Sequence, residues 1–182
     1  MSDPLERYLD ELQGWGARMN LVGSTDRDDL RVHLDDSLAA AAALPEGARV
    51  VDLGTGAGLP GMPIAIARPD LDLTLVEIRE RRVHFLRHVA RVLSLDVTIE
   101  RARIEDPPAR GYDFVLARAV LPPRKILPLA AAWAGRDGEV WIWTRETPAE
   151  AGVPEAAILP LSVGRGAILR VPAAAVSRGT LG

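Results

Sequence analysis

A glycine-rich segment around residue 55 has the residue types and spacing best suited to ligand binding. The apolar run over 49–53 predicts a buried strand, and the glycines after it predict a tight turn that leads into a helix. Glycines at this spacing also let the backbone approach a ligand with no Cβ in the way. The residues concerned are Asp52 within the run, then Gly54, Gly56, Gly58 and Gly61.

A carboxylate closes the next apolar run. Glu77 follows Leu73-Thr74-Leu75-Val76, 23 residues after Gly54. In an open α/β sheet the ligand lies beyond the carboxyl ends of neighbouring strands, where an acidic side chain can accept both hydroxyls of a ribose. The alternative is that Glu77 only pairs with a following arginine, namely Arg79, Arg81 or Arg82.

Charge distinguishes two nucleotide cofactors for this loop. Gly56, Gly58 and Gly61 also satisfy the G-x-G-x-x-G pattern of NAD sites. A pyrophosphate favours a helix N-terminus with nearby cations, yet residues 50–67 contain no lysine or arginine, and Asp52 stands at the mouth of the loop. A carboxylate repels a pyrophosphate but suits a sulfonium and an ammonium group. The pattern therefore favours S-adenosylmethionine over NAD.

The elements that must position these residues follow from hydrophobic periodicity and turn residues. Their alternation predicts an α/β fold, a Rossmann-like, doubly wound and mostly parallel sheet with helices on both faces and an N-terminal helical extension. The expected helices are 4–19, about 28–43, 60–68, 79–93 and 123–134, and the expected strands are 49–53, 72–77, 96–100, 113–117, about 138–143 and 167–171.

Length and composition predict one domain over residues 1–182, with an N-terminal helical segment 1–46, a core 47–172 and a flexible tail 173–182. The chain has no cysteine and three histidines, so we expect neither a disulfide nor a metal site. It has no leader-like segment and no run of eighteen apolar residues, which predicts a cytoplasmic protein without a membrane partner. We expect a monomer.

The formal charge of −3 hides a gradient along the chain. Residues 1–52 contain 11 acidic and 5 basic residues, whereas residues 79–125 contain 6 acidic and 11 basic residues. A local excess of positive charge is typical of nucleic-acid-binding surfaces.

Five segments together resemble the bacterial small-subunit rRNA methyltransferase G family, within the class I S-adenosylmethionine-dependent methyltransferases. The resemblance spans residues 5–145 and keeps the order and spacing of the motifs. It departs at Ala117, where the family usually has serine, and at Thr144-Arg145, where lysine-glycine is common. The segments are Trp15 with Met19-Asn20-Leu21-Val22, His33-Leu34-Asp35-Asp36-Ser37-Leu38, the loop 52–61, Arg81-Arg82-Val83-His84-Phe85-Leu86, and Arg118-Ala119-Val120.

The resemblance implies methylation of N7 of one guanine in the 530 loop of 16S rRNA, with 16S rRNA or the small ribosomal subunit as partner. Because guanine N7 has a free lone pair and no proton to lose, such a transfer needs in-line positioning and no general base. Two other functions remain open: a small-molecule methyltransferase, and a catalytically lapsed RNA- or ribosome-binding homologue.

Within that resemblance, the glycine loop is expected to hold the methionyl part of the cofactor, Glu77 the ribose, and Ile104 and Glu105 the adenine. Glu105 alternatively caps a turn. Arg118 is the candidate catalytic residue, gripping the methionine carboxylate or the target phosphate, with a structural ion pair as the alternative. The expected cofactor-binding set is Asp52, Gly54, Thr55, Gly56, Gly58, Glu77, Ile104, Glu105 and Arg118.

Two further groups have alternative interpretations. His33 and Asp36 lie three residues apart on one helical face, so they either cover the cofactor or hydrogen-bond the helix to the core; Asn20 has the same two alternatives. Three tryptophans are expected to pack in the core, namely Trp133, Trp141 and Trp143.

Overall fold

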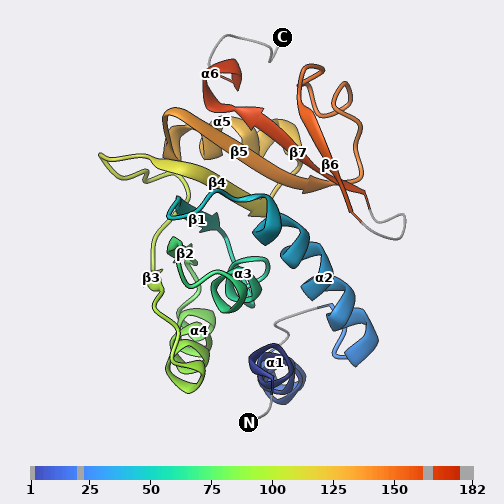
Figure 1. Cartoon of the computed structure of the whole chain (residues 1–182), viewed down its shortest axis with the longest axis vertical. Helices are drawn as coiled ribbons and strands as arrows, with labels where there is room; N and C mark the ends of the chain where they lie inside the picture. The colour runs from blue at the N-terminus through green and yellow to red at the C-terminus, as the bar shows by residue number, and fades with distance from the viewer. Residues whose placement is uncertain (1–2, 20–22, 162–165, 177–182) are drawn as a thin grey trace.

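The computed structural model describes residues 3–19, 23–161 and 166–176. Within them, seven strands form one sheet in the order β3-β2-β1-β4-β5-β7-β6 (Figure 1). Neighbours among β1 to β5 are parallel, and β7 is antiparallel to both β5 and β6. The predicted doubly wound, mostly parallel sheet is confirmed. Its strands are β1 (Arg49–Leu53), β2 (Asp72–Val76), β3 (Thr98–Glu100), β4 (Tyr112–Arg118), β5 (Ala134–Thr144), β6 (Ala157–Pro160) and β7 (Ala167–Pro172).

The register of the central strands determines what meets at the carboxyl edge of the sheet. Leu53, the last residue of β1, is level with Val76 on β2 and with Ala117 on β4. The residues that follow these positions, Gly54, Glu77 and Arg118, therefore emerge side by side from three neighbouring strands.

Helices cover both faces of the sheet, as the sequence predicts. Alternate side chains of each strand enter opposite cores: Val50 and Trp141 contribute to one, Val51 and Ile142 to the other. The first core also contains residues of α1, α2, α3 and α4, and the second those of α5, with α6 packed against it. The helices are α1 (Pro4–Met19), α2 (Arg27–Ala43), α3 (Gly61–Ala67), α4 (Glu80–Leu93), α5 (Pro123–Trp133) and α6 (Ala173–Val176). The three tryptophans are buried, as expected.

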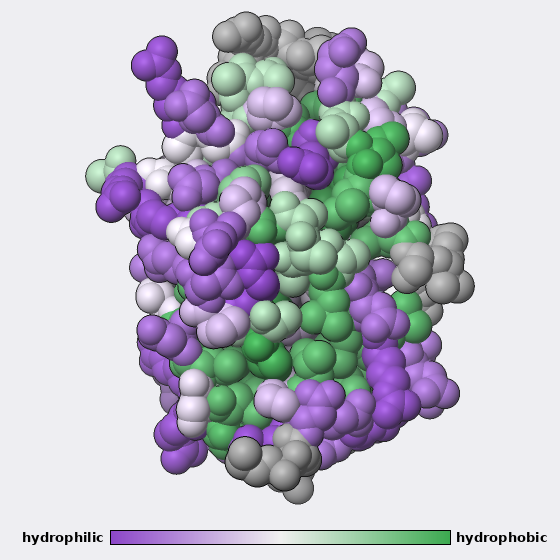
Figure 2. All heavy atoms as spheres, in the orientation of Figure 1, coloured by the Kyte–Doolittle hydropathy of each residue, from purple (hydrophilic) through white to green (hydrophobic). Residues whose placement is uncertain are grey.

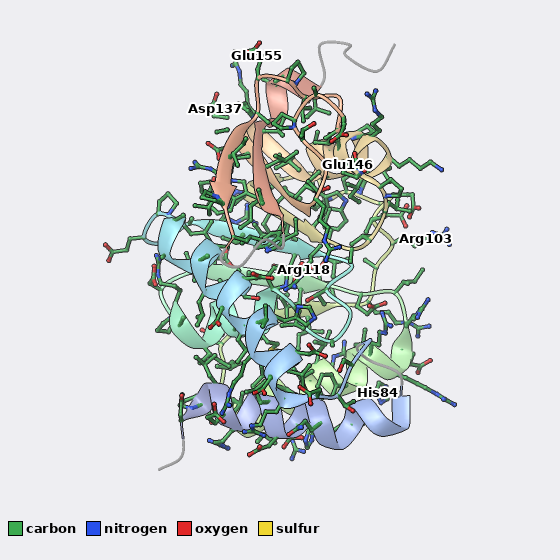
Figure 3. All side chains as sticks on the ribbon, turned by 90° about the vertical axis from the view of Figure 1, so that its right-hand side faces the viewer. His84, Arg103, Arg118, Asp137, Glu146 and Glu155 are labelled. Carbon is green, nitrogen blue, oxygen red and sulfur yellow. The ribbon has the colours of Figure 1, made fainter. Side chains whose placement is uncertain are left out.

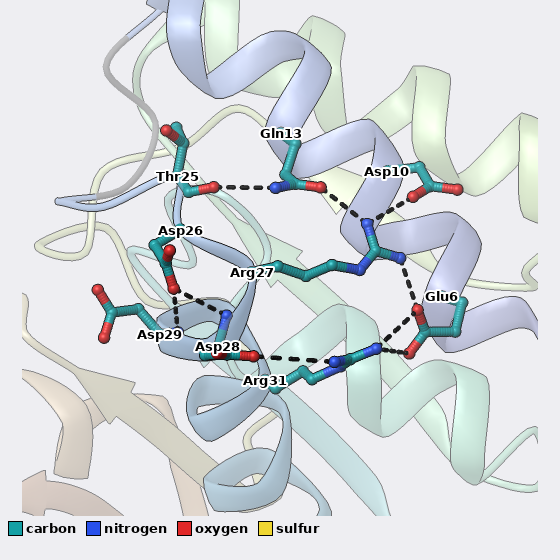
Figure 4. A network of polar contacts seen from close by, with 9 residues as sticks. All are labelled: Glu6, Asp10, Gln13, Thr25, Asp26, Arg27, Asp28, Asp29 and Arg31. Atoms are coloured by element: carbon teal, nitrogen blue, oxygen red, sulfur yellow. Dashed lines mark hydrogen bonds and ion pairs between the residues drawn. The ribbon is translucent and has the colours of Figure 1, made fainter.

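A polar network joins the two N-terminal helices (Figure 4). Arg27 on α2 contacts Glu6 at 2.5 Å, Asp10 at 2.7 Å and Gln13 at 2.7 Å on α1. At the start of α2, Asp26 accepts hydrogen bonds from the backbone N–H groups of Asp28 and Asp29 and caps the helix. Single exposed ion pairs contribute little, but here one guanidinium is shared among three partners and links the two helices.

The first helix also packs against α4. Trp15 lies 5.6 Å from Phe85 and 5.2 Å from His88, measured between ring centroids. Nε2 of His88 is 2.9 Å from Glu11, so His88 joins two helices and is half-buried, whereas His84 is exposed. The N-terminal extension is thereby attached to the sheet domain.

Three differences from the expected elements lie in the last third of the chain. β5 begins at Ala134, earlier than expected, because Ala134 pairs with Tyr112 across a register shift. A Cβ on Gly138 would lie 2.7 Å from the carbonyl oxygen of Tyr112, so glycine permits this pairing. The short edge strand β6 was not predicted, and α6 occupies part of the expected flexible tail. The division into segments 1–46 and 47–172 stays a prediction.

Candidate functional site

The glycine loop after β1 adopts a backbone that ordinary residues disfavour. Gly54, Gly56 and Gly58 have φ angles of +64°, +62° and +94°, which lie in the left-handed region that glycine enters without a Cβ clash. The N–H of Thr55 donates to the carbonyl of Val76 at 3.0 Å, which attaches the loop to the end of β2. A Cβ on Gly54 would lie 2.9 Å from the side chain of Val120, so the loop also packs closely against the segment after β4.

Asp52 lies fully buried beneath this loop. Its Oδ2 accepts hydrogen bonds from Oγ1 of Thr55 at 2.6 Å and from the N–H of Gly61 at 2.9 Å. Its Oδ1 has no hydrogen-bond partner among the described residues. Burial raises the pKa of Asp52 to about 7, although these two hydrogen bonds and the charge of Arg118 oppose the rise. The site thus contains a carboxyl group that titrates near neutral pH.

Glu77 points into the site from the end of β2, with a side chain only 5% exposed. One carboxylate oxygen accepts the backbone N–H of Arg79 at 2.8 Å, and the other is 3.5 Å from Nη1 of Arg82. The expected alternative, pairing with a following arginine, is therefore present. It does not exclude a ligand, because a carboxylate can accept about four hydrogen bonds.

A cavity of about 460 Å³ opens at the carboxyl edge of the sheet. Its volume falls in the range of about 300–1,000 Å³ that is typical of small-molecule sites. Ile78, directly after Glu77, is 47% exposed, which is unusual for a large apolar side chain and provides an apolar wall. The lining residues are Gly54, Val76, Glu77, Ile78, Arg79, Arg82, Ala102, Arg103, Ile104, Glu105, Ala119 and Val120.

The loop after β3 forms the opposite wall and is anchored from α5. Nε1 of Trp133 donates to the carbonyl of Ile104 at 2.7 Å. Glu105 lies in a turn, its side chain is 53% exposed, and it is 3.7 Å from Arg103. Trp133 was expected only to pack in the core, and its additional anchoring contact was not predicted.

The structure brings together part of the predicted set. Gly54, Glu77, Ile104 and Glu105 line the cavity, Asp52 lies buried under the loop beside it, and Thr55 is buried within that loop. Gly56, Gly58 and Arg118 do not line this cavity. Sequence reasoning missed Ile78, Arg82, Ala119 and Val120, although their places just after β2 and β4 were a usable signal.

Arg118 faces the N-terminal extension at the end of β4 (Figure 3). It donates hydrogen bonds to the carbonyl of His33 at 3.3 Å, to Nδ1 of His33 and to Oδ2 of Asp36 at 3.2 Å. The side chains of Arg118 and Asp36 are 13% and 3% exposed. The structural alternatives named for these three residues are thus realised, while any role at a cofactor stays a prediction. Asn20 lies outside the described residues.

A second contact from the extension reaches the glycine loop itself. The hydroxyl of Tyr8 on α1 donates to the carbonyl of Ala57 at 2.8 Å, and Tyr8 is fully buried. Burial and the nearby Asp52 raise the pKa of Tyr8 well above its usual value, so it remains a neutral donor. The extension therefore contacts both the loop after β1 and the residue that ends β4.

Comparison with known proteins identifies the family. The model of the GidB family, rRNA small subunit methyltransferase G, matches residues 1–151. The chain belongs to this family. Among curated relatives with the name ribosomal RNA small subunit methyltransferase G, the protein of Desulfotalea psychrophila is 46% identical over 64% of this chain and 57% of its own length. That of Gluconobacter oxydans is 38% identical over 74% of this chain and 69% of its own length. Matches to other family members cover as little as 48% of the relative, so this chain spans about half to two-thirds of the relatives' length.

Solved structures agree on the fold of this family member. The S-adenosylmethionine-dependent methyltransferase SibL superposes with a TM-score of 0.64 at 18% identity, covering 93% of this chain and 69% of SibL. Magnesium protoporphyrin IX methyltransferase from Synechocystis superposes with a TM-score of 0.60 at 18% identity, covering 94% and 96% of the two chains. At these identities the likeness establishes the class I methyltransferase fold alone. Across the part of the chain that the structure describes, no helix has the length and apolar character needed to cross a membrane.

Proposed function

We propose that this chain is an S-adenosylmethionine-dependent methyltransferase that methylates N7 of a guanine in 16S rRNA. Family membership supports the activity and the RNA substrate. The observation that carries the proposal is that Gly54 and Glu77, from the ends of two neighbouring strands, line one cavity of about 460 Å³. A glycine loop beside a carboxylate suits a nucleoside that carries a positive charge.

The residues present fit this cofactor. Glu77 would accept the ribose hydroxyls, and Ile78 and Ile104 would lie against the adenine. The loop at Gly56 would hold the methionyl group, since a Cβ on Gly56 would meet, among the described residues, only Nη1 of Arg82 at 3.4 Å and one backbone oxygen. The buried Asp52, with an Oδ1 that lacks a hydrogen-bond partner among the described residues, would supply the negative charge for the cofactor's cations.

The proposed methyl transfer requires positioning of the reactants more than proton transfer. S-adenosylmethionine supplies an activated methyl group when bound, and guanine N7 offers a lone pair without a proton. The chain would fix both partners in line, which can contribute several kcal/mol by removing translational and rotational freedom. Arg118, the candidate catalytic residue, would orient the methionine carboxylate or a substrate phosphate from its place between β4 and α2. In this proposal the protein works as a cytoplasmic monomer.

Cofactor binding tests the site. Calorimetry with S-adenosylmethionine is expected to show binding by the wild-type protein and a loss of about 1–3 kcal/mol for Glu77→Ala, because the ribose hydroxyls lose a charged acceptor. Glu80→Ala is the matched control, since this substitution removes the same charge three residues away, from a side chain that is 62% exposed. Equal affinities for wild type and Glu77→Ala would remove the ribose assignment, and no binding at millimolar cofactor would favour a lapsed homologue.

The RNA product tests the reaction. N7-methylguanine in 16S rRNA is expected to disappear in a strain that lacks this protein and to return when the gene is restored. Persistence of every such mark in the deletion strain would refute the RNA substrate and favour a small-molecule acceptor.

A further inference from the structure

One face of α4 carries a row of basic side chains. Arg81, Arg87 and Arg91 are exposed, and His84 between them is 66% exposed. At 3.6 residues per turn these four positions fall on one side of the helix. We call these four residues the α4 stripe. They extend about 15 Å along the helix axis at 1.5 Å per residue.

The arginines of the α4 stripe are not neutralised within the described protein. Arg81, Arg87 and Arg91 have no described carboxylate within ion-pair distance, and Glu80, the acidic residue on this face, is shared between Arg101 at 3.4 Å and His84 at 3.9 Å. Some arginines elsewhere are paired with carboxylates, whereas Arg110 and Arg136 have no ion pair in the described structure.

Arg27, Arg68 and Arg170 each contact a carboxylate at 2.5–3.0 Å. Like charges four residues apart, as at Arg87 and Arg91, destabilise a helix slightly. Such a row is therefore better explained by an anionic partner than by the stability of the helix.

The α4 stripe begins at the rim of the cavity. Helix α4 starts three residues after Glu77, and Arg79 and Arg82 at its beginning line the cavity. His84 and Arg103 lie toward the same side of the molecule, while Arg118 lies nearer the middle of the view (Figure 3). The surface along the left-hand edge of the space-filling view, on the side of α4 and β3, is mainly hydrophilic (Figure 2). A strand with one nucleotide at the cavity could thus continue along α4 past Arg79 and Arg82 at the cavity rim.

We propose that the α4 stripe binds the phosphate backbone of the RNA whose target base is presented at the cavity. This inference rests on the proposed function and specifies which side of the protein the RNA approaches. On the side of the segment after β5, acidic side chains accompany the basic ones, as at Glu146, Glu150 and Glu155. They would repel phosphates there, and this contrast favours the α4 side.

The test compares two variants of equal charge. Arg87→Gln/Arg91→Gln removes two arginines of the stripe. The control, Arg110→Gln/Arg136→Gln, removes two exposed arginines that also lack an ion pair in the described structure; Arg110 precedes β4, and Arg136 lies near the start of β5. The affinity of the full chain for 16S rRNA is measured by fluorescence anisotropy at several salt concentrations. Calorimetry with S-adenosylmethionine is measured alongside, and neither double variant is expected to change the cofactor dissociation constant.

The expected result follows from counterion release. Losing two phosphate contacts lowers the slope of log affinity against log salt by about 1.4–1.8, so the ratio of wild-type to stripe-variant affinity rises about tenfold when salt falls from about 200 to 50 mM. The control variant is expected to keep the wild-type slope within about 0.5.

Equal losses of RNA affinity in the two double variants would show that only net charge matters. Unchanged RNA affinity in the stripe variant would show that RNA binds elsewhere. Either outcome overturns the proposal. If the stripe variant keeps the wild-type affinity for RNA but no longer binds poly-glutamate, the stripe is assigned to an acidic protein partner instead. If the wild-type protein itself binds cofactor but no RNA, the proposed RNA substrate fails, and that result is distinct from failure of the stripe.

Discussion

Affinity for S-adenosylmethionine is expected to rise about eightfold between about pH 6 and pH 7.5, because Asp52 must lose a proton to attract the cofactor's cations. The carboxyl group is fully buried, and its pKa is raised to about 7. At about pH 6, therefore, only about one molecule in eleven carries the charged carboxylate before the cofactor binds.

The magnitude follows from linkage. An opposite charge a few ångströms away can lower a carboxyl pKa by as much as about 3 units, and a lowering of that size holds Asp52 ionised in the bound state throughout this range. The association constant then scales with the fraction of free protein that is already ionised, which rises from about 0.09 at pH 6 to about 0.76 at pH 7.5. Binding at about pH 7 is expected to release about half a proton.

Titration calorimetry measures both quantities. Dissociation constants are determined across the pH range, and the heats in two buffers of different ionisation enthalpy give the protons released. The range stops at about pH 7.5 because the cofactor's own amino group loses its proton near pH 8. Methylthioadenosine, which keeps the adenosine but has neither sulfonium nor ammonium, is expected to bind without this dependence.

Asp52→Asn is the matched variant. The amide oxygen of asparagine can still accept from Oγ1 of Thr55 and the N–H of Gly61, the two donors to Oδ2 of Asp52. The variant cannot ionise, so its cofactor affinity is expected to be lower at pH 7.5 and nearly constant with pH. A flat wild-type profile, or the same slope in Asp52→Asn, would refute the assignment of Asp52 as the group that meets the positive charge.

Three further predictions concern the same part of the molecule. Because the folded pKa of Asp52 is raised from 3.8 to about 7, its contribution to stability is complete below the unfolded pKa and is lost as pH rises through the folded pKa. Asp52→Asn, which cannot ionise, is therefore expected to melt at a higher temperature than wild type near pH 8, with a free energy of unfolding higher by up to about 4 kcal/mol. A less stable variant would contradict this. Gly61→Ala would place a Cβ 2.2 Å from Leu75 and 2.8 Å from Oδ2 of Asp52, so thermal unfolding should show a loss of about 1–3 kcal/mol from overpacking, and an unchanged melting temperature would argue against this close approach. Arg118→Met removes the cation beside the buried carboxylate of Asp36 and should cost about 3–5 kcal/mol; Arg118→Lys should restore stability more than methyl transfer, and equal recovery of both would make Arg118 structural only.

Much of the fold could be predicted because local patterns and the geometry of parallel strands suffice for it. Each central strand is a short apolar run bounded by turn residues, and such runs must alternate with helices when both faces are buried. Glu77 could be placed beside Gly54 because neighbouring parallel strands end at the same edge. The edge strand β6 was missed because its residues Ala157–Pro160 are mostly exposed and so lack a strong apolar signal.

The sequence by itself determined the backbone of the site, since the loop needs glycine where φ is positive and the carboxylates are fixed at the ends of their strands. Only the tertiary structure decided what holds that site in place. Tyr8 contacts Ala57 from 49 positions away, Arg118 contacts His33 from 85 away, and Trp133 contacts Ile104 from 29 away. No local periodicity encodes such pairs, because they depend on how helices far apart in the chain pack across the sheet, and that packing depends on the whole core at once.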